Sequence, residues 1–141
     1  MPSSELVRWS GLAAMLGGAL WSIGFNFVGW GEPGTPVYER YEAYNRLLPL
    51  ALLPVTAGIV GLHAVQRGSY GPLGKAGFVA VLVGLAIAGS VGEFWVFTEQ
   101  PYGVAGGRDA SWMIYLLGHL ILAIGSVLFG IATVRAGILP R

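Results

Sequence analysis

The stretch KAGFVAVLVGLAIAGSVGEFWVFT, residues 75–98, decides the fold because it is almost entirely apolar over the thickness of a lipid bilayer. About 20 apolar residues in a helix span the hydrocarbon core, since each residue advances the helix by about 1.5 Å. The stretch also contains Glu93, a carboxylic acid where hydrocarbon is expected. A charged group at bilayer depth is costly, so Glu93 is a candidate functional residue whose partner must lie elsewhere in the chain.

The composition of the whole chain indicates the same class of protein. Of the 141 residues, 55% are hydrophobic and only 11% are charged, and the mean hydropathy is +0.67. Soluble domains carry about 25% charged residues. The 23 glycines suit membrane helices that pack backbone to backbone. A net charge of +1 without any basic stripe argues against nucleic-acid binding, and the absence of cysteine excludes disulfides and thiolate chemistry.

Three further apolar stretches on either side of residues 75–98 also have membrane-spanning length. The predicted spans are residues 7–30, 47–65, 75–98 and 112–134. We therefore expect one all-α domain over residues 1–141, an integral membrane four-helix bundle with up-down-up-down connections. A short interfacial helix over residues 37–46 should lead into the second span, and Pro49 and Pro54 should kink the outer half of that span.

Lysine and arginine residues predict the orientation of this bundle. Most of them lie at the ends that would share a side with the two termini, whereas the opposite loops hold most of the acidic residues. Because positive residues concentrate in cytoplasmic segments, both termini should be cytoplasmic. We expect a multi-pass protein of a bacterial-type inner or cell membrane. The residues that set this orientation are Arg8, Arg67, Lys75, Arg135 and Arg141.

Two rows of small residues predict where helices approach one another. The first span has Ala14, Gly18 and Ser22 at four-residue steps, and the third span has a longer row that includes Gly84 and Ala88. Such rows let two backbones come close together. We expect the first and third helices to contact each other, and the same Gly/Ala ridges are available for a homo-oligomer.

Three predicted helices each place one polar side chain at one level of the outer leaflet. Glu93 lies five residues before Thr98, His119 lies seven residues after Trp112, and Asn26 lies near the end of the first span. At a rise of about 1.5 Å per residue, Glu93 and His119 lie about 7–10 Å below the outer ends of their helices. We predict that Glu93 and His119 are catalytic and that Asn26 holds a substrate oxygen. Aromatic residues should wall this pocket and bind the substrate: Trp21, Phe25, Trp95, Phe97, Trp112 and Tyr115.

These residues favour a membrane enzyme that acts on a lipophilic small molecule. A carboxyl group in apolar surroundings can exchange a proton near neutral pH, which suits an isomerase, a cyclase or an epoxide-opening hydrolase. Two other interpretations stay open. The same pocket can belong to a proton-coupled transporter or a small-molecule or lipid-binding protein, or the chain can be a non-catalytic subunit of a membrane complex.

No cofactor motif or set of metal ligands is present in the sequence, so we expect neither a cofactor nor a metal. The two histidines are His63 and His119, and His63 lies close to the cytoplasmic end of its span. Their predicted depths differ by more than about 10 Å, which is too far for one haem to bridge them. We expect a structural or interfacial role for His63.

Overall fold

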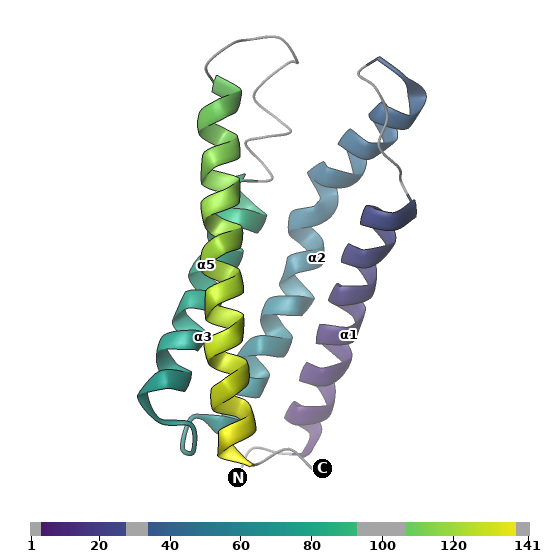
Figure 1. Cartoon of the computed structure of the whole chain (residues 1–141). Coiled ribbons are helices and arrows are strands. Elements are labelled where there is room, and N and C mark those ends of the chain that lie inside the picture. Colours follow the sequence, from purple (N-terminus) through teal and green to yellow (C-terminus); the bar gives the residue numbers. More distant parts are fainter. Residues whose placement is uncertain (1–3, 28–33, 93–106, 138–141) are drawn as a thin grey trace.

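The computed structural model describes residues 4–27, 34–92 and 107–137 (Figure 1). The elements follow one another as α1 (Ser4–Phe27), α2 (Pro36–Gln66), α3 (Gly71–Leu85), the π-helix η1 (Ala86–Gly92) and α5 (Gly107–Ala136). Within these described ranges there is no strand. The prediction of an all-α fold is confirmed.

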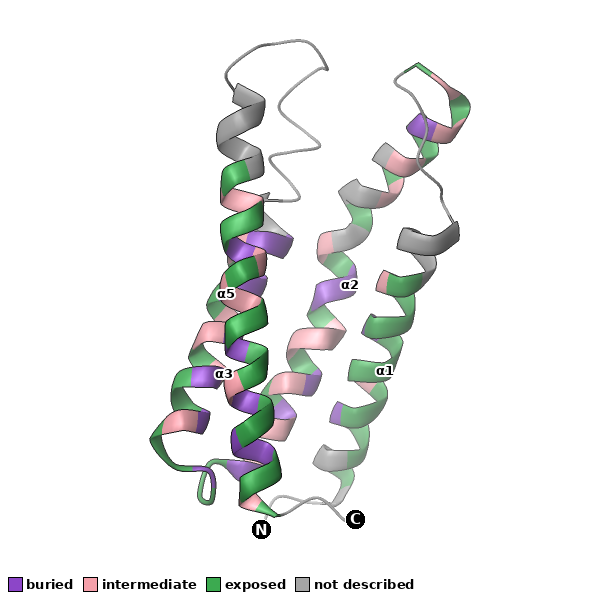
Figure 2. Cartoon of the chain, in the orientation of Figure 1, coloured by how far each residue is buried: buried purple, intermediate pink, exposed green. Residues whose placement is uncertain are grey.

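Three stretches of the described helices are long and apolar enough to cross a membrane, namely Pro49–Gln66, Gly71–Gly89 and Met113–Ala136. The outward surface of the molecule is also apolar. Many residues of the described helices are exposed (Figure 2), and large hydrophobic ones are among them, such as Leu53 at 65% and Val134 at 81%. Exposing so much apolar surface to water would be unfavourable in free energy, whereas lipid tails would cover it.

The helices pack as two antiparallel pairs. One pair is α1 with α2, and the other is α3 and η1 with α5, while α2 meets α3 and η1 over a much shorter surface. Figure 1 shows that three points lie at the same end of the molecule: the start of α1, the passage from α2 to α3, and the end of α5. We call this the link end, after the α2–α3 link at residues 67–70.

Glycines allow the α3 and α5 backbones to touch. A Cβ atom added at Gly84 would lie only 2.5 Å from the Leu122 nitrogen, and one added at Gly77 would lie 2.5 Å from the Phe129 nitrogen. Seen from α5, the same close approach recurs for Gly118 against Ala88 and for Gly125 against Val81. The two residue numbers of each pair have the same sum, as one continuous antiparallel register requires.

The predicted contact between the first and third helices is wrong. Gly84 faces α5, and a Cβ atom added at Gly18 would meet nothing within 4 Å. The closely packed pairs among the described helices do not include α1 with α3. The reason is that the Gly84 row packs on α5, while α1 packs on α2 through a different face, which includes Ala14 and Gly17 but not Gly18. On α2, for example, a Cβ atom at Gly58 would lie 2.5 Å from the Ala14 Cβ atom.

The second helix is longer than predicted, because the interfacial helix expected at residues 37–46 is its first part. The Thr35 hydroxyl caps it by accepting a hydrogen bond from the Tyr38 N–H at 3.3 Å. Pro36 occupies the first turn, where its missing N–H is not needed. The helix then continues through Pro49 and Pro54 to Gln66.

The third and fourth helices also begin earlier than predicted. α3 begins at Gly71, where a φ of +64° makes glycine favourable, and α5 begins at Gly107. The third helix was expected to continue regularly to residue 98. Instead it changes to the π-helix η1 at Ala86, and residues 93–98 lie outside the described residues.

The buried core joins α2, α3 and α5 from the link end to the middle of the helices, and buried residues are purple in Figure 2. It includes one buried polar pair. The Thr133 hydroxyl on α5 lies 2.8 Å from Oε1 of Gln66 and 2.9 Å from the Phe129 carbonyl oxygen. Gln66 is fully buried, and its Nε2 has no hydrogen-bond partner among the described residues. The apolar core consists of Leu52, Tyr70, Val81, Leu85, Phe129 and Ala132.

Candidate functional site

A cluster of three rings lies between α1 and α5, toward the end opposite the link end. The Trp21 and His119 ring centroids are 6.4 Å apart, with the rings edge to face at 76°. The Tyr115 ring centroid lies 4.2 Å from that of His119. We call Trp21, Tyr115 and His119 the His119 cluster. Trp21 comes from one helix pair and the other two residues come from the second pair, so the cluster lies where the two pairs meet.

Helix periodicity places Tyr115 and His119 together, since residues four apart lie on the same face of α5. His119 Nδ1 lies 2.9 Å from the carbonyl oxygen of Tyr115. Because a carbonyl oxygen only accepts hydrogen bonds, Nδ1 is the donor in this contact. In the tautomer with a proton on Nδ1 alone, Nε2 has a lone pair that can accept a hydrogen bond or a proton.

Tyr44 of α2 is part of the same level of the molecule, and the sequence analysis missed it. Its hydroxyl donates a hydrogen bond to the Leu20 carbonyl oxygen and lies 3.5 Å from the Trp21 carbonyl oxygen. This contact fixes the α1 backbone at the point that carries the Trp21 ring. Tyr38, Tyr41 and Tyr44 recur every three residues, a spacing that could have indicated one aromatic helix face.

The structure brings together three of the nine predicted site residues, Trp21, Tyr115 and His119. Glu93, Trp95 and Phe97 lie outside the described residues. The other three predicted residues belong to described helices, although their side chains lie outside the described part of the structure: Phe25 and Asn26 in the last turn of α1, and Trp112 near the start of α5.

The π-helix η1 connects the described structure to Glu93. Ala88 in η1 is fully buried, and a Cβ atom added at Gly118 would lie 2.5 Å from the Ala88 nitrogen. Gly118 immediately precedes His119, and Ala88 is five residues before Glu93. η1 is therefore packed beside the His119 position. Such π-helical segments are rare and occur frequently at functional sites.

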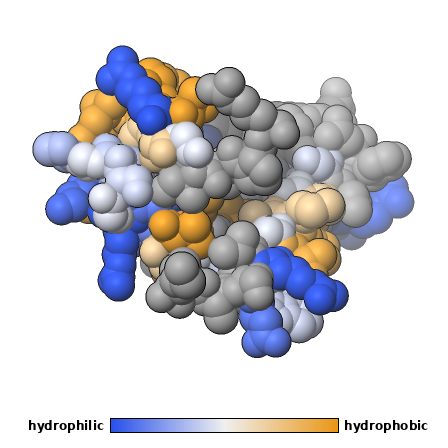
Figure 3. Space-filling view, turned by 90° about the horizontal axis from the view of Figure 1, so that it is seen from below, coloured by the Kyte–Doolittle hydropathy of each residue, from blue (hydrophilic) through white to orange (hydrophobic). Residues whose placement is uncertain are grey.

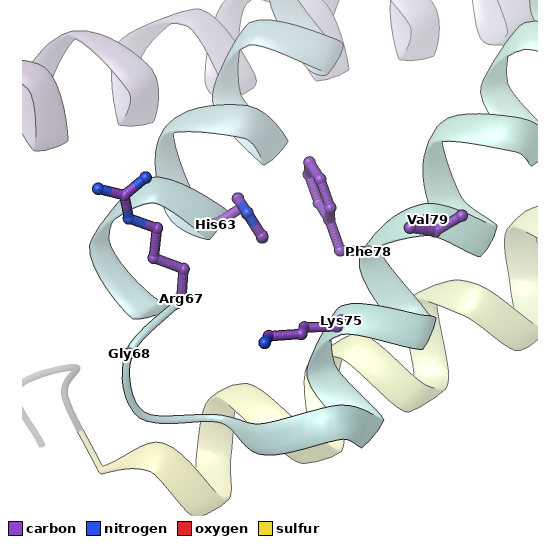
Figure 4. A pocket seen from close by; sticks show the side chains of 6 residues that line it. All are labelled: His63, Arg67, Gly68, Lys75, Phe78 and Val79. Atoms are coloured by element: carbon purple, nitrogen blue, oxygen red, sulfur yellow. The ribbon is translucent and has the colours of Figure 1, made fainter.

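An open pocket at the link end is a second feature that the sequence analysis missed (Figure 4). Its volume is about 620 Å³. One wall is formed by the His63 ring stacked on the Phe78 ring, with centroids 3.8 Å apart and planes 14° apart. The Tyr70 hydroxyl forms a hydrogen bond with His63 Nδ1. These contacts give His63 a role in holding α2 and α3 together. The pocket is lined by His63, Arg67, Gly68, Lys75, Phe78 and Val79.

Within residues 4–27, 34–92 and 107–137, no three histidine or acidic side chains gather as metal ligands would. The chain matches no protein-family model, no curated protein and no solved structure. Its function is therefore inferred from its own residues.

Proposed function

We propose that this chain is a small multi-pass membrane enzyme that performs acid–base chemistry on a lipophilic small molecule at the His119 cluster. In this proposal all four α-helices span the membrane and both termini are cytoplasmic. Three apolar helix stretches and the pairing of the helices support the spanning arrangement. The orientation is supported by the positions of Arg67 and Lys75 beside the α2–α3 link, on the side that positive residues favour.

The observation that carries the proposal is the state of the His119 ring. The ring lies within an apolar span and contacts aromatic rings from both helix pairs. A hydrogen bond to the Tyr115 carbonyl oxygen makes Nδ1 the donor, and in the tautomer with a proton on Nδ1 alone Nε2 is a base. A polar ring inside a membrane span is costly, and such residues are usually found at functional sites.

An isomerisation is the simplest reaction that these groups can catalyse, because the proton removed and the proton added balance each other. Nε2 of His119 would take a proton from one atom of the ligand, and the electron pair left behind would shift along the ligand. In this proposal the carboxyl group of Glu93 would give a proton to a second atom of the ligand. No oxidant, reductant or added group is needed. The Trp21 ring, which contacts the His119 ring, would stabilise the positive charge of the imidazolium that forms when Nε2 takes the proton.

Deuterium exchange tests the proposed isomerisation whatever the substrate. The small molecule that co-purifies with the full chain is extracted, identified by mass spectrometry, and incubated with fresh protein in D₂O. Proton transfer to and from carbon should place deuterium in the ligand. The His119→Ala and Glu93→Gln variants should lose this exchange, while His63→Ala should keep it. Binding without any exchange in the wild-type protein would refute the catalytic proposal and leave a binding or transport protein.

A further inference from the structure

The pocket at the link end gathers positive charge without any acidic residue in its lining. Arg67 is exposed at the end of α2, and Lys75 is exposed in the first turns of α3. Figure 4 shows Lys75 reaching from α3 toward the end of α2, where Arg67 and His63 lie. Figure 3 views this end directly and shows hydrophilic side chains around hydrophobic ones. Two full positive charges therefore flank one opening.

The hydrogen bond between Tyr70 and His63 adds a third donor to the pocket. Burial raises the pKa of the Tyr70 phenol, so the hydroxyl keeps its proton at neutral pH and can donate it to His63 Nδ1. In the tautomer that accepts this hydrogen bond at Nδ1, the ring proton is on Nε2. An imidazole N–H, a guanidinium and an ammonium together form a donor set that suits the oxygens of a phosphate group.

The other side of the pocket is apolar and continues along the outer face of α3. Phe78 and Val79 of α3 complete the lining. Val79 is 57% exposed, and Val83, one helical turn further from the link end, is 43% exposed. A ligand seated here would meet positive charge at the end of the helices and hydrocarbon along the outer face of α3. A free anion uses only the first of these surfaces, whereas a phospholipid uses both.

We propose that this pocket binds an anionic phospholipid, with its phosphate headgroup held by Arg67, Lys75 and His63 and an acyl chain lying along Val79 and Val83. Basic pockets between helices at the cytoplasmic face suit anionic headgroups, which concentrate in that leaflet. The inference rests on the membrane location given under the proposed function. It does not depend on the chemistry at His119.

Native mass spectrometry of the full chain in detergent tests this site with two lipids, phosphatidylglycerol and phosphatidylcholine. The wild-type protein should retain one phosphatidylglycerol molecule and bind phosphatidylcholine much more weakly. Removing Arg67 and Lys75 together, as Arg67→Gln with Lys75→Gln, should weaken phosphatidylglycerol binding about 25-fold, or about fivefold for each cation. The matched control is Arg8→Gln with Arg135→Gln, which removes the same charge outside the pocket lining and should leave binding unchanged.

Three results would overturn the proposal. Equal weakening in the two double variants would show a diffuse attraction to the positive end of the molecule. Equal binding of both lipids would show that the pocket does not select for the negative charge of phosphatidylglycerol. Displacement of the lipid by an equal concentration of inorganic phosphate would assign the pocket to a free anion. Failure here with intact deuterium exchange at His119 would leave the proposed enzyme standing, and the converse result would leave the lipid site standing.

Discussion

Substituting Gly84 with alanine should destabilise the protein because this glycine is where α3 and α5 touch most directly. The added Cβ atom would lie 2.5 Å from the Leu122 nitrogen and 2.6 Å from its Cα atom, whereas ordinary contact begins near 3.4 Å. The two backbones would have to separate by about 0.9 Å, the difference between 3.4 and 2.5 Å. Backbone atoms cannot turn aside as a flexible side chain can.

The cost should be about 1–3 kcal/mol, as is typical of overpacking at a filled site. The better helix propensity of alanine offsets up to about 1 kcal/mol of that cost. Gly18→Ala is the matched control, since it makes the same chemical change at a helical site with nothing within 4 Å. It should be neutral or slightly stabilising. Thermal unfolding of both variants in one detergent, followed by circular dichroism, measures the difference.

The opposite ranking would refute this account of the packing. If Gly84→Ala leaves the unfolding temperature unchanged, then α3 and α5 do not touch at this glycine, and if both substitutions lower it, then α1 is packed through Gly18 as a contact with α3 would require. Equal increases in the two variants would mean that helix propensity alone decides the outcome. Gly84→Leu should lower the unfolding temperature further than Gly84→Ala, because a larger side chain forces a wider separation.

Three further outcomes are expected. Tyr44→Phe should cost about 0.5–1.5 kcal/mol in thermal unfolding, since it removes the hydroxyl that joins α2 to the α1 backbone. Gln66→Leu combined with Thr133→Val should stay close to the wild-type stability or exceed it, whereas Gln66→Ala alone should destabilise, because only the double variant removes both buried polar groups without leaving a cavity. The chain has no cysteine, so single cysteines report topology: in intact cells an impermeant thiol reagent should label Glu39→Cys and leave Gly68→Cys unlabelled, and the reverse would invert the orientation.

The sequence predicted the helices well because apolar runs of this length leave few alternatives. Residues 47–65 and 112–134 fall within α2 and α5. Trp21 and Tyr115 were expected among the aromatic residues around His119, and their rings contact the His119 ring. The position of a residue along the membrane normal follows from counting residues at a constant rise per residue. This depth is therefore the feature of a membrane site that a single sequence predicts most directly.

Which helix lies beside which was not predictable in the same way. Ridges of small residues occur on every helix of this glycine-rich chain, and the row containing Gly84 fits α5 as readily as α1. The change to a π-helix at Ala86 has no signal in the apolar pattern either, since that pattern does not distinguish one hydrogen-bond spacing from another. The pocket at the link end was missed because Arg67 and Lys75 counted only as orientation signals and not as a pair across a turn.

Native mass spectrometry of the full chain, purified in a mild detergent, tests the central claim most directly. The wild-type protein should carry one lipophilic small molecule of a single mass. His119→Ala and Trp21→Ala should each lose most of it, because both remove a wall of the His119 cluster. Trp9→Ala is the matched control, since Trp9 is 65% exposed, and it should retain the molecule. Wild-type protein without a bound small molecule, or equal retention in all three variants, would contradict a ligand site at His119.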